Sequence, residues 1–298
     1  MKYLKTLALS LAVGGSSMVT AQAATEMRCS HQLPPGHHIA KVIDQWAAEV
    51  ESQSDGEIDV QIFGADSLVG ARENIVSTAK GDIDVWRKWP DSDAAAFLGE
   101  KLEEKGLKNV VWLFTTNSSV FTSNGKFLKA PEDFEGVKIR GLEPSFNASL
   151  EAMGAAPSSM SGSKVYQALA TGVIDAAITD VAAAVSRKYY EVQDHFVVLP
   201  VISVYFHGYV NPTWYDGLSD KAKAALDGAG KKAAGWAIEA SLAASASAPD
   251  QLKEKGANVH IATDAENAAL QDAMRPAFNA KFAGDPDSQK LIELIDQM

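Results

Sequence analysis

The side chain best placed to bind a ligand is Arg140, which stands near the end of a predicted strand at residues 137–141. Pro144 follows at a position suited to the start of a helix, because its missing N–H costs nothing there. In open α/β sheets, ligands bind beyond the carboxyl ends of the strands. A guanidinium also matches a carboxylate in bidentate geometry. Arg140 is therefore a candidate clamp for an organic acid, and the alternative is a surface ion pair with Glu135 or Glu143.

Residues suited to catalysis or metal binding are sparse. The sequence has no G-x-S-x-G, H-E-x-x-H or C-x-x-C pattern, and the Ser-Gly-Ser-Lys run at 161–164 lacks the first glycine of a phosphate loop. His31, His37 and His38 lie close together, but their spacing fits no standard zinc set. The single Cys29 excludes an intrachain disulfide. We therefore predict no catalytic residue, no bound metal and no cofactor.

The composition indicates a globular, acidic protein that is exported. The 298 residues are 46% hydrophobic and 22% charged, which excludes a disordered, collagen-like or multi-span membrane chain. A formal net charge of −11 argues against nucleic acid as a partner, because phosphate neutralisation needs a basic surface. Residues 1–23 are typical of a signal peptide, with Lys2 and Lys5, a short apolar stretch and a small-x-small site ending at Ala23. We expect a periplasmic protein without stable membrane insertion.

The elements that position these side chains alternate between helix and strand. Periodicity and stop signals predict helix 37–52, strand 58–62, helix 71–80, strand 83–85, strand 137–141, helix 144–153, helix 163–171 and strand 173–179. Ala-x-Gly-x-Ile-Asp occurs at both 79–84 and 170–175, each time where a helix is predicted to pass into a strand. This repetition favours two similar α/β lobes. No flexible linker separates them, so we expect the chain to cross between the lobes more than once.

The last eighty residues are predicted to be mostly helical. Ser219 is a candidate N-cap for a long alanine-rich helix that reaches toward Lys255. A short strand is predicted at 258–262. Thr263 then caps a final pair of helices, which are separated near Gly284.

Five segments, in order, resemble motifs of the TRAP-transporter solute-binding proteins, the DctP family. Residues 130–140, A-P-E-D-F-E-G-V-K-I-R, resemble the family motif P-E-D-L-K-G-x-K-I-R. Residues 68–73 resemble L-G-G-x-R-E, and residues 165–175 resemble V-Y-x-A-L-Q-T-G-V-V-D. Residues 190–193 and 218–219 also fall in register. The resemblance covers nearly the whole chain after residue 23.

The resemblance implies a two-lobed α/β fold of the periplasmic-binding-protein type (type II-like), with a long C-terminal helix bridging the lobes. Residues 24–120 are expected to form lobe 1, residues 121–215 mainly lobe 2, and residues 216–298 a helical segment across both. The implied function is capture of an organic carboxylate in the cleft between the lobes and its delivery to a TRAP-type membrane permease. The alternatives are an extracytoplasmic sensor that uses the same cleft, or an exported metal-dependent enzyme.

In the family an arginine at the position of Arg140 pairs with the ligand carboxylate. Thr179 stands where the family has a ligand-binding asparagine, and Asp180 adds a negative charge beside it. Ser119 stands where many members have a second arginine, so one positive charge is lost. These changes favour a mono-acid with polar substituents over a di-acid. The ligand-binding residues that we predict are Arg140, Thr179, Asp180, Tyr166, His31 and Glu73.

Two further departures concern space in the cleft and in lobe 1. Gly162 replaces an aromatic residue of the family, so the cleft should be wider there or filled by another ring. The candidate rings are Trp86, Tyr205 and Phe206. After Val85 the chain also lacks a segment that the family has, which predicts a lobe 1 shortened by a strand near residues 86–97. Trp86 and Trp89 either fill that gap or are ordinary core residues.

Overall fold

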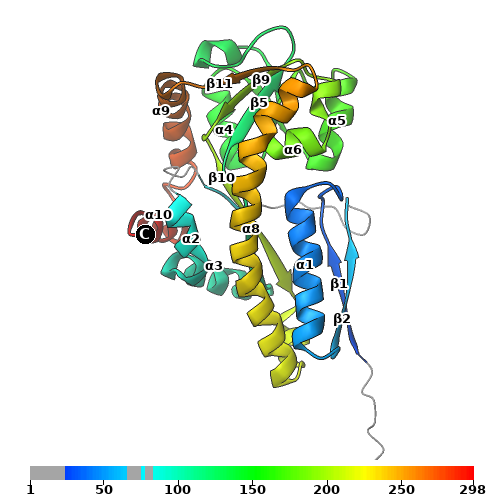
Figure 1. Cartoon of the computed structure of the whole chain (residues 1–298). Coiled ribbons are helices and arrows are strands. Elements are labelled where there is room, and N and C mark those ends of the chain that lie inside the picture. The colour runs from blue at the N-terminus through cyan, green and yellow to red at the C-terminus, as the bar shows by residue number, and fades with distance from the viewer. Residues whose placement is uncertain (1–23, 66–74, 78–82) are drawn as a thin grey trace, which may run out of the picture.

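The computed structural model describes residues 24–65, 75–77 and 83–298. It has two α/β halves that the long helix α8 (Asp220–Glu254) spans, as Figure 1 shows, so the predicted two-lobed fold is confirmed. We call the half built on a two-stranded and a three-stranded sheet lobe 1, and the half built on a six-stranded sheet lobe 2. The predicted signal peptide, residues 1–23, and Glu73 lie outside the described residues.

Lobe 1 contains a parallel two-stranded sheet and an antiparallel three-stranded sheet. The strands are β1 (Thr25–Ser30), β2 (Ile58–Phe63), β3 (Ile75–Ser77), β4 (Lys108–Thr116) and β10 (Ser203–Val210). β1 and β2 are parallel, and β10 lies between β3 and β4 and is antiparallel to both. Helix α1 (His38–Gln53) buries an apolar stripe at helical spacing, which packs with α8 in one core cluster.

Lobe 2 is a mixed sheet with the order β11-β9-β5-β8-β6-β7. The bounds are β5 (Ser119–Ser123), β6 (Lys138–Gly141), β7 (Ala156–Ser159), β8 (Ala176–Asp180), β9 (His195–Leu199) and β11 (Asn258–Ile261). β6 is parallel to both of its neighbours, β7 and β8, so the carboxyl ends of these three strands share one edge.

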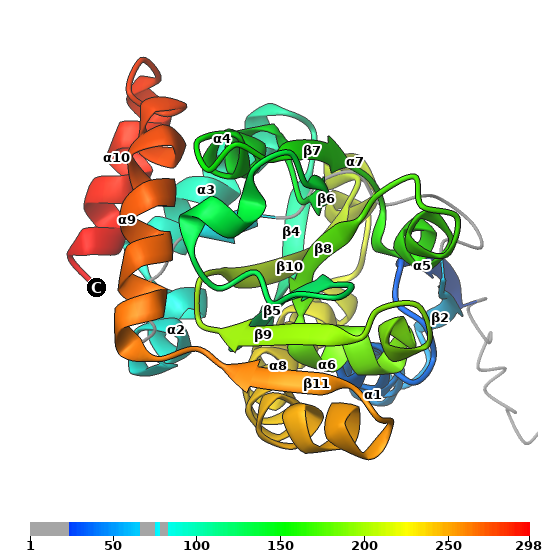
Figure 2. The same ribbon diagram turned by 90° about the horizontal axis from the view of Figure 1, so that it is seen from above.

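Helices cover both faces of the lobe 2 sheet, which Figure 2 shows from above. One face packs on α4 (Pro144–Glu151) and α9 (Asp264–Ala280). The other packs on α5 (Gly162–Ala170), α6 (Val181–Ser186) and the last turns of α8. Further short helices include the 3₁₀ turns Pro131–Phe134 and Tyr189–Glu191, and α7 (Pro212–Asp216), which belongs to lobe 1.

The chain passes between the lobes from β4 to β5, from β9 to β10 and along α8, as the missing linker predicts. Ser119 links the β4–β5 and β9–β10 connections by hydrogen bonds. Its hydroxyl donates to Leu199 O at 2.6 Å and accepts from Val201 N at 3.3 Å. The predicted cap of α8 is confirmed, since Ser219 Oγ accepts from Ala222 N. Among the described helices, none is long and apolar enough to cross a bilayer.

Two sequence predictions in lobe 1 are wrong. Residues 83–85 belong to a helix, α2 (Ile83–Lys88), because Ile83 and Trp86 are three residues apart and both pack on the same aromatic core. Residues 75–77, expected in a helix, form β3, which pairs with the edge of β10, so tertiary pairing overrides the local pattern. The chain continues through a 3₁₀ turn at Trp89–Asp91 and α3 (Asp93–Glu104), against which α10 (Pro286–Asp296) packs.

Trp86 and Trp89 are core residues of lobe 1. Both are almost fully buried, and their rings lie 5.5–6.2 Å from those of Phe114, Trp112 and Tyr205. The Tyr205 hydroxyl donates to Trp86 O. Packing of large aromatic rings at such offsets is strongly stabilising. Both tryptophans therefore help to form the aromatic core of lobe 1.

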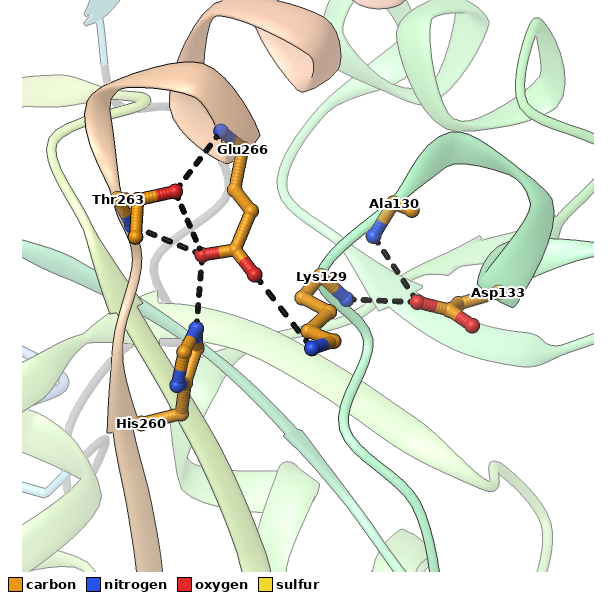
Figure 3. Close-up of polar contacts among 6 residues, drawn as sticks. All are labelled: Lys129, Ala130, Asp133, His260, Thr263 and Glu266. Carbon is orange, nitrogen blue, oxygen red and sulfur yellow. Dashed lines mark hydrogen bonds and ion pairs between the residues drawn. The ribbon is translucent and has the colours of Figure 1, made fainter.

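A polar network joins β11, the start of α9 and the loop before residue 131 (Figure 3). Glu266 accepts from Thr263 N and lies 2.8 Å from His260 Nε2, and its other oxygen lies 3.5 Å from Lys129 Nζ. Thr263 Oγ1 accepts from Glu266 N, which completes the capping box that begins α9. The Thr263 backbone bond and then His260 lower the pKa of Glu266 to about 2.

Glu266→Gln should lower the free energy of unfolding by about 1 kcal/mol at neutral pH, since a charge-assisted bond becomes a neutral one. A carboxyl with a depressed pKa stabilises the fold above its unfolded pKa, near 4.5, and loses that effect as pH falls toward 2. Urea unfolding of both proteins from pH 7 to pH 2.5 measures this, and the difference should shrink below pH 4.5. Asp272→Asn, an exposed change on the same helix, is the control. A difference that does not change with pH would contradict this assignment.

Candidate ligand-binding site

A group of polar residues is buried or half-buried where the two lobes meet. Lobe 2 contributes residues at the carboxyl ends of β6 and β8 and beside α5 and α6, and lobe 1 contributes residues around the start of α1. We call this group the interlobe cluster, and its members are Gln32, His37, His38, Arg140, Gly162, Thr179, Asp180 and Arg187. Its place at the carboxyl ends of strands is where α/β sheets bind ligands.

Arg140 is 6% exposed and holds its guanidinium against backbone carbonyls. Nη1 donates to Ile178 O at 2.8 Å, and Nη2 and Nε donate to Met160 O at 3.3 and 3.4 Å. These three bonds use three of the five N–H groups of the guanidinium, so two remain for a ligand. Within the described part of the chain no acid pairs with Arg140, so the alternative of an ion pair with Glu135 or Glu143 is wrong. Burial lowers the pKa of Arg140 to about 10, so it stays charged.

Thr179 and Asp180 end β8 beside Arg140. Arg140 pairs with Ala177 across the two strands, and side chains alternate along a strand, so Thr179 lies on the same face as Arg140. The Asp180 Oδ1 caps α6 by accepting from Ala183 N at 2.9 Å. Its Oδ2 is buried without a hydrogen-bond partner among the described residues. Burial raises the pKa of the Asp180 carboxyl to about 7, because the charged form loses its contact with water.

His37 and His38 approach from lobe 1 with stacked rings, 4.4 Å between centroids. His37 is the N-cap of α1, and its Nδ1 accepts from Ile39 N at 3.2 Å. His38 Nε2 lies 3.2 Å from Thr115 O and 3.1 Å from Ser241 Oγ. Burial lowers the pKa of His37 well below its ordinary value and that of His38 to about 4, so both rings are neutral.

These two histidines and Asp180 each place one potential metal-ligand atom within 4.8 Å of the others. Because His37 Nδ1 accepts from Ile39 N, the neutral ring carries its proton on Nε2, which leaves no lone pair for a metal. Arg187 also brings a positive charge, which lowers the pKa of His37. The cluster is therefore better suited to hydrogen bonding than to holding a cation.

Arg187 is the functional candidate that the sequence prediction missed. It follows α6 directly, and its guanidinium lies against Gly162, where a Cβ would overlap Nη1. Its Nε is buried, and the guanidinium donates to none of the described residues. The charge of Arg187 acts to lower the pKa of Arg140, His37 and Asp180, so Arg187 lies near all three. The sequence signal that could have identified Arg187 is its spacing from Asp180, which is seven residues, or two helical turns.

The expectations for the space beside Gly162 are wrong. The space is neither wider nor filled by an aromatic ring, because the guanidinium of Arg187 occupies it. Trp86 and Tyr205 are instead in the aromatic core of lobe 1, and Phe206 packs between two other core clusters. A positive charge is thus present here, although the position of Ser119 has none.

Gln32 joins the two lobes directly and was also missed. Its Oε1 accepts from Gly162 N at 3.0 Å and from Ser161 Oγ at 3.3 Å. Gln32 is buried and follows β1 in lobe 1, whereas Gly162 begins α5 in lobe 2. The contact therefore holds the two lobes together at the edge of the interlobe cluster.

The remaining predicted residues lie outside this cluster. Tyr166 donates to Glu191 at 2.8 Å on an exposed face of lobe 2. His31 follows β1, and its Nδ1 accepts from Leu33 N at 3.2 Å. Its charge contributes to the lowered pKa of His37, so it lies near the cluster without belonging to it. Glu73 is not among the described residues. His207, also outside the cluster, packs on aromatic rings of β4 and β10.

A groove of about 440 Å³ runs between α1, α6 and α8, so both lobes contribute to its walls. His38 and Lys41 line it from lobe 1, and Ala182 and Ser186 line it from lobe 2. Because His38 also belongs to the interlobe cluster, the groove reaches the cluster from the side of α8.

The profile of a protein family described as "Bacterial extracellular solute-binding protein, family 7" (DctP) matches residues 29–88 and 82–285. The two matched stretches overlap at residues 82–88, next to the place near residues 86–97 where lobe 1 is predicted to be shortened. This match covers most of the chain and nearly all of its described residues.

The chain is also similar in sequence to individual solute-binding proteins. A solute-binding protein of Albidiferax ferrireducens is 27% identical over 59% of this chain, which spans 61% of that relative's length. The C4-dicarboxylate-binding periplasmic protein DctP of Rhodobacter capsulatus is 26% identical over 90% of this chain and 89% of its own. That alignment runs over 308 positions, more than the 298 residues present, so the relative carries residues that this chain lacks.

The fold is that of solved solute-binding proteins. The crystal structure of a TRAP periplasmic solute-binding protein from Sulfitobacter sp., with bound β-D-galacturonate, superposes with a TM-score of 0.80. It covers 92% of this chain and 100% of its own, at 20% sequence identity. The similarity therefore extends over both lobes and the helix between them.

Proposed function

Because this chain belongs to the DctP family of bacterial extracellular solute-binding proteins, we propose that it binds an organic carboxylate between its lobes and delivers it to a TRAP-type permease. The named relative binds C4-dicarboxylates and the similar structure holds a galacturonate. Both ligands are carboxylates, which supports this class of ligand. The proposed place of action is the periplasm, with residues 1–23 as the signal peptide.

The observation that carries the proposal is the guanidinium of Arg140. It is buried at the interlobe cluster, and among the residues that the structure describes its hydrogen bonds go only to the neutral carbonyls of Ile178 and Met160. A buried charge without an opposite charge is costly unless a counterion reaches it. A ligand carboxylate on the two remaining N–H groups provides that counterion in bidentate geometry.

The other cluster residues then complete the binding of the acid. Thr179, on the same face as Arg140, can donate to or accept from the ligand. The neutral His37 offers its Nε2–H from the opposite lobe. A ligand held from both sides stabilises the form in which the lobes are together, which is a population shift toward closure. The work is capture and release, so no catalytic step is proposed.

Thermal unfolding with a panel of small carboxylic acids, each paired with its neutral amide, tests the function. An acid at a hundredfold excess over its Kd stabilises the fold by about 2.7 kcal/mol. For a chain of this size that corresponds to a rise in Tm of roughly 5–10 °C. We expect one group of acids to give this rise and their amides to give none. Equal shifts for acids and amides, or no shift with any acid, would overturn the proposal.

A further inference from the structure

We propose that Asp180 and Arg187 form a second subsite that binds hydroxyl groups, so that the ligand is a hydroxylated monocarboxylate. The inference rests on the proposed function, since Arg140 is taken to hold the carboxylate. It adds the chemistry of the rest of the molecule. It also accounts for two polar groups that the carboxylate clamp does not use.

Both residues carry a buried polar atom without a partner. Asp180 Oδ2 and Arg187 Nε are inaccessible to solvent, and neither hydrogen-bonds to any described residue. A buried polar group left in this state destabilises the fold, and more so when it is charged. Such groups are rare in native proteins and indicate a missing partner. Here two such atoms occur, the acceptor Asp180 Oδ2 and the donor Arg187 Nε.

The placement of Arg187 depends on a residue without a side chain. The guanidinium occupies the position that a Cβ of Gly162 would take, so any other residue there would displace it. Asp180 is equally fixed, because its Oδ1 is held by the first turn of α6. The two side chains attract each other but form no ion pair within 4.0 Å. The opposite charges of Asp180 and Arg187 are therefore not joined in a direct ion pair.

A hydroxyl is the group that satisfies both sides. It donates one hydrogen bond and accepts others, so it can donate to Asp180 Oδ2 and accept from Arg187. A methylene chain would leave both atoms unsatisfied. A second carboxylate could accept from Arg187 but would oppose the ionised Asp180.

The total charge of the cluster supports the same class of ligand. Arg140 and Arg187 carry two positive charges and ionised Asp180 carries one negative charge, while His37 and His38 are neutral. The excess is one positive charge, which one carboxylate neutralises. A dianion would leave a net negative charge in a buried site, and burial of unbalanced charge is costly. Loss of the Asp180 charge would shift the balance toward dianions.

Calorimetric titration with three acids of four carbons tests this inference. Butyrate has the carboxylate alone, D-erythronate adds three hydroxyls, and succinate adds a second carboxylate. For the natural protein at pH 8 we expect D-erythronate to bind about 10- to 100-fold more tightly than either of the others. Asp180→Asn preserves the cap of α6, because asparagine is an equally good N-cap. It should reduce the preference for D-erythronate over butyrate about tenfold and strengthen succinate binding.

Arg187→Gln should lower D-erythronate affinity and leave butyrate affinity within about threefold, since Arg187 is not needed for the first carboxylate. Gly162→Ala should act in the same direction, because it displaces the guanidinium without removing its charge. The matched controls are Asp285→Asn, the exposed N-cap of α10, and Arg275→Gln, an exposed arginine on α9. Both controls should bind all three acids like the natural protein.

The results separate this inference from the proposed function. Arg140-dependent binding of all three acids with equal affinity, unchanged in Asp180→Asn, would overturn the hydroxyl subsite and leave carboxylate capture standing. A preference for succinate in the natural protein would also overturn it. Failure of all carboxylates in the thermal panel, in contrast, would remove the proposed function itself.

Discussion

Replacing Arg140 with alanine is expected to weaken carboxylate binding by about 2–5 kcal/mol, or roughly 30- to 5,000-fold in Kd. The guanidinium is buried, and its two remaining N–H groups lie at the interlobe cluster. Without it the ligand carboxylate loses both its counter-charge and its bidentate partner. The tightest acid of the thermal panel, titrated by calorimetry into both proteins, measures the loss.

Two further variants show whether the guanidinium itself is responsible. Arg140→Lys keeps the positive charge but not the planar fork, so it should recover only part of the affinity. Lys138→Ala removes an exposed positive charge on the same strand, where the ammonium pairs with Asp175, and should leave binding unchanged. Tight binding that persists in Arg140→Ala would refute the assignment of Arg140 as the carboxylate clamp.

Asp180→Asn is expected to make the ligand-free protein more stable above pH 7, by on the order of 2–4 kcal/mol. Burial raises the pKa of this carboxyl in the folded state to about 7, from an ordinary value of 3.8. Between these values the folded protein holds a proton that the unfolded chain has lost. Stability therefore falls as pH rises from about 4 to 7, and the lost stability is not recovered above that window. Asparagine has no such proton to lose.

Urea unfolding of both proteins from pH 4 to pH 9 measures this effect. The stabilities should be similar at pH 4 and diverge until about pH 7. Asp285→Asn provides a contrast of opposite sign, because hydrogen bonds from Ser288 lower the pKa of that exposed carboxyl. It should be slightly less stable than the natural protein at neutral pH. If Asp180→Asn were less stable at pH 8, the carboxylate would be a structural partner and not a destabilised functional group.

The sequence predicts those features that depend on neighbours along the chain. Ser219 and Thr263 were identifiable as helix caps because the cap and the N–H that it accepts from are three residues apart. Arg140 was identifiable because a strand, a glycine and a proline-initiated helix follow one another. Thr179 and Asp180 were identified through the resemblance to the family, because Thr179 stands where the family has a ligand-binding asparagine.

The features that the sequence does not reveal arise from contacts between distant segments. In the sequence, Gly162 appears only as the replacement of an aromatic residue of the family. In the structure it makes space for the side chain of Arg187, which is twenty-five residues later in the chain. Gln32 meets Gly162 across the lobes, and no local pattern records that pairing. The helix at Ile83–Lys88 was predicted as a strand because alternation over three residues is too short to identify either structure.

The hydrogen bond between Gln32 and Gly162 has a consequence for how a permease distinguishes loaded from unloaded receptors. One neutral hydrogen bond contributes only about 1 kcal/mol, which is small beside the cost of bringing Arg140 and Arg187 into one dry site. Without an anion, the proposed receptor would therefore spend most of its time open. A permease that recognises only the closed shape would then ignore empty receptors, so they would not compete with loaded ones for docking.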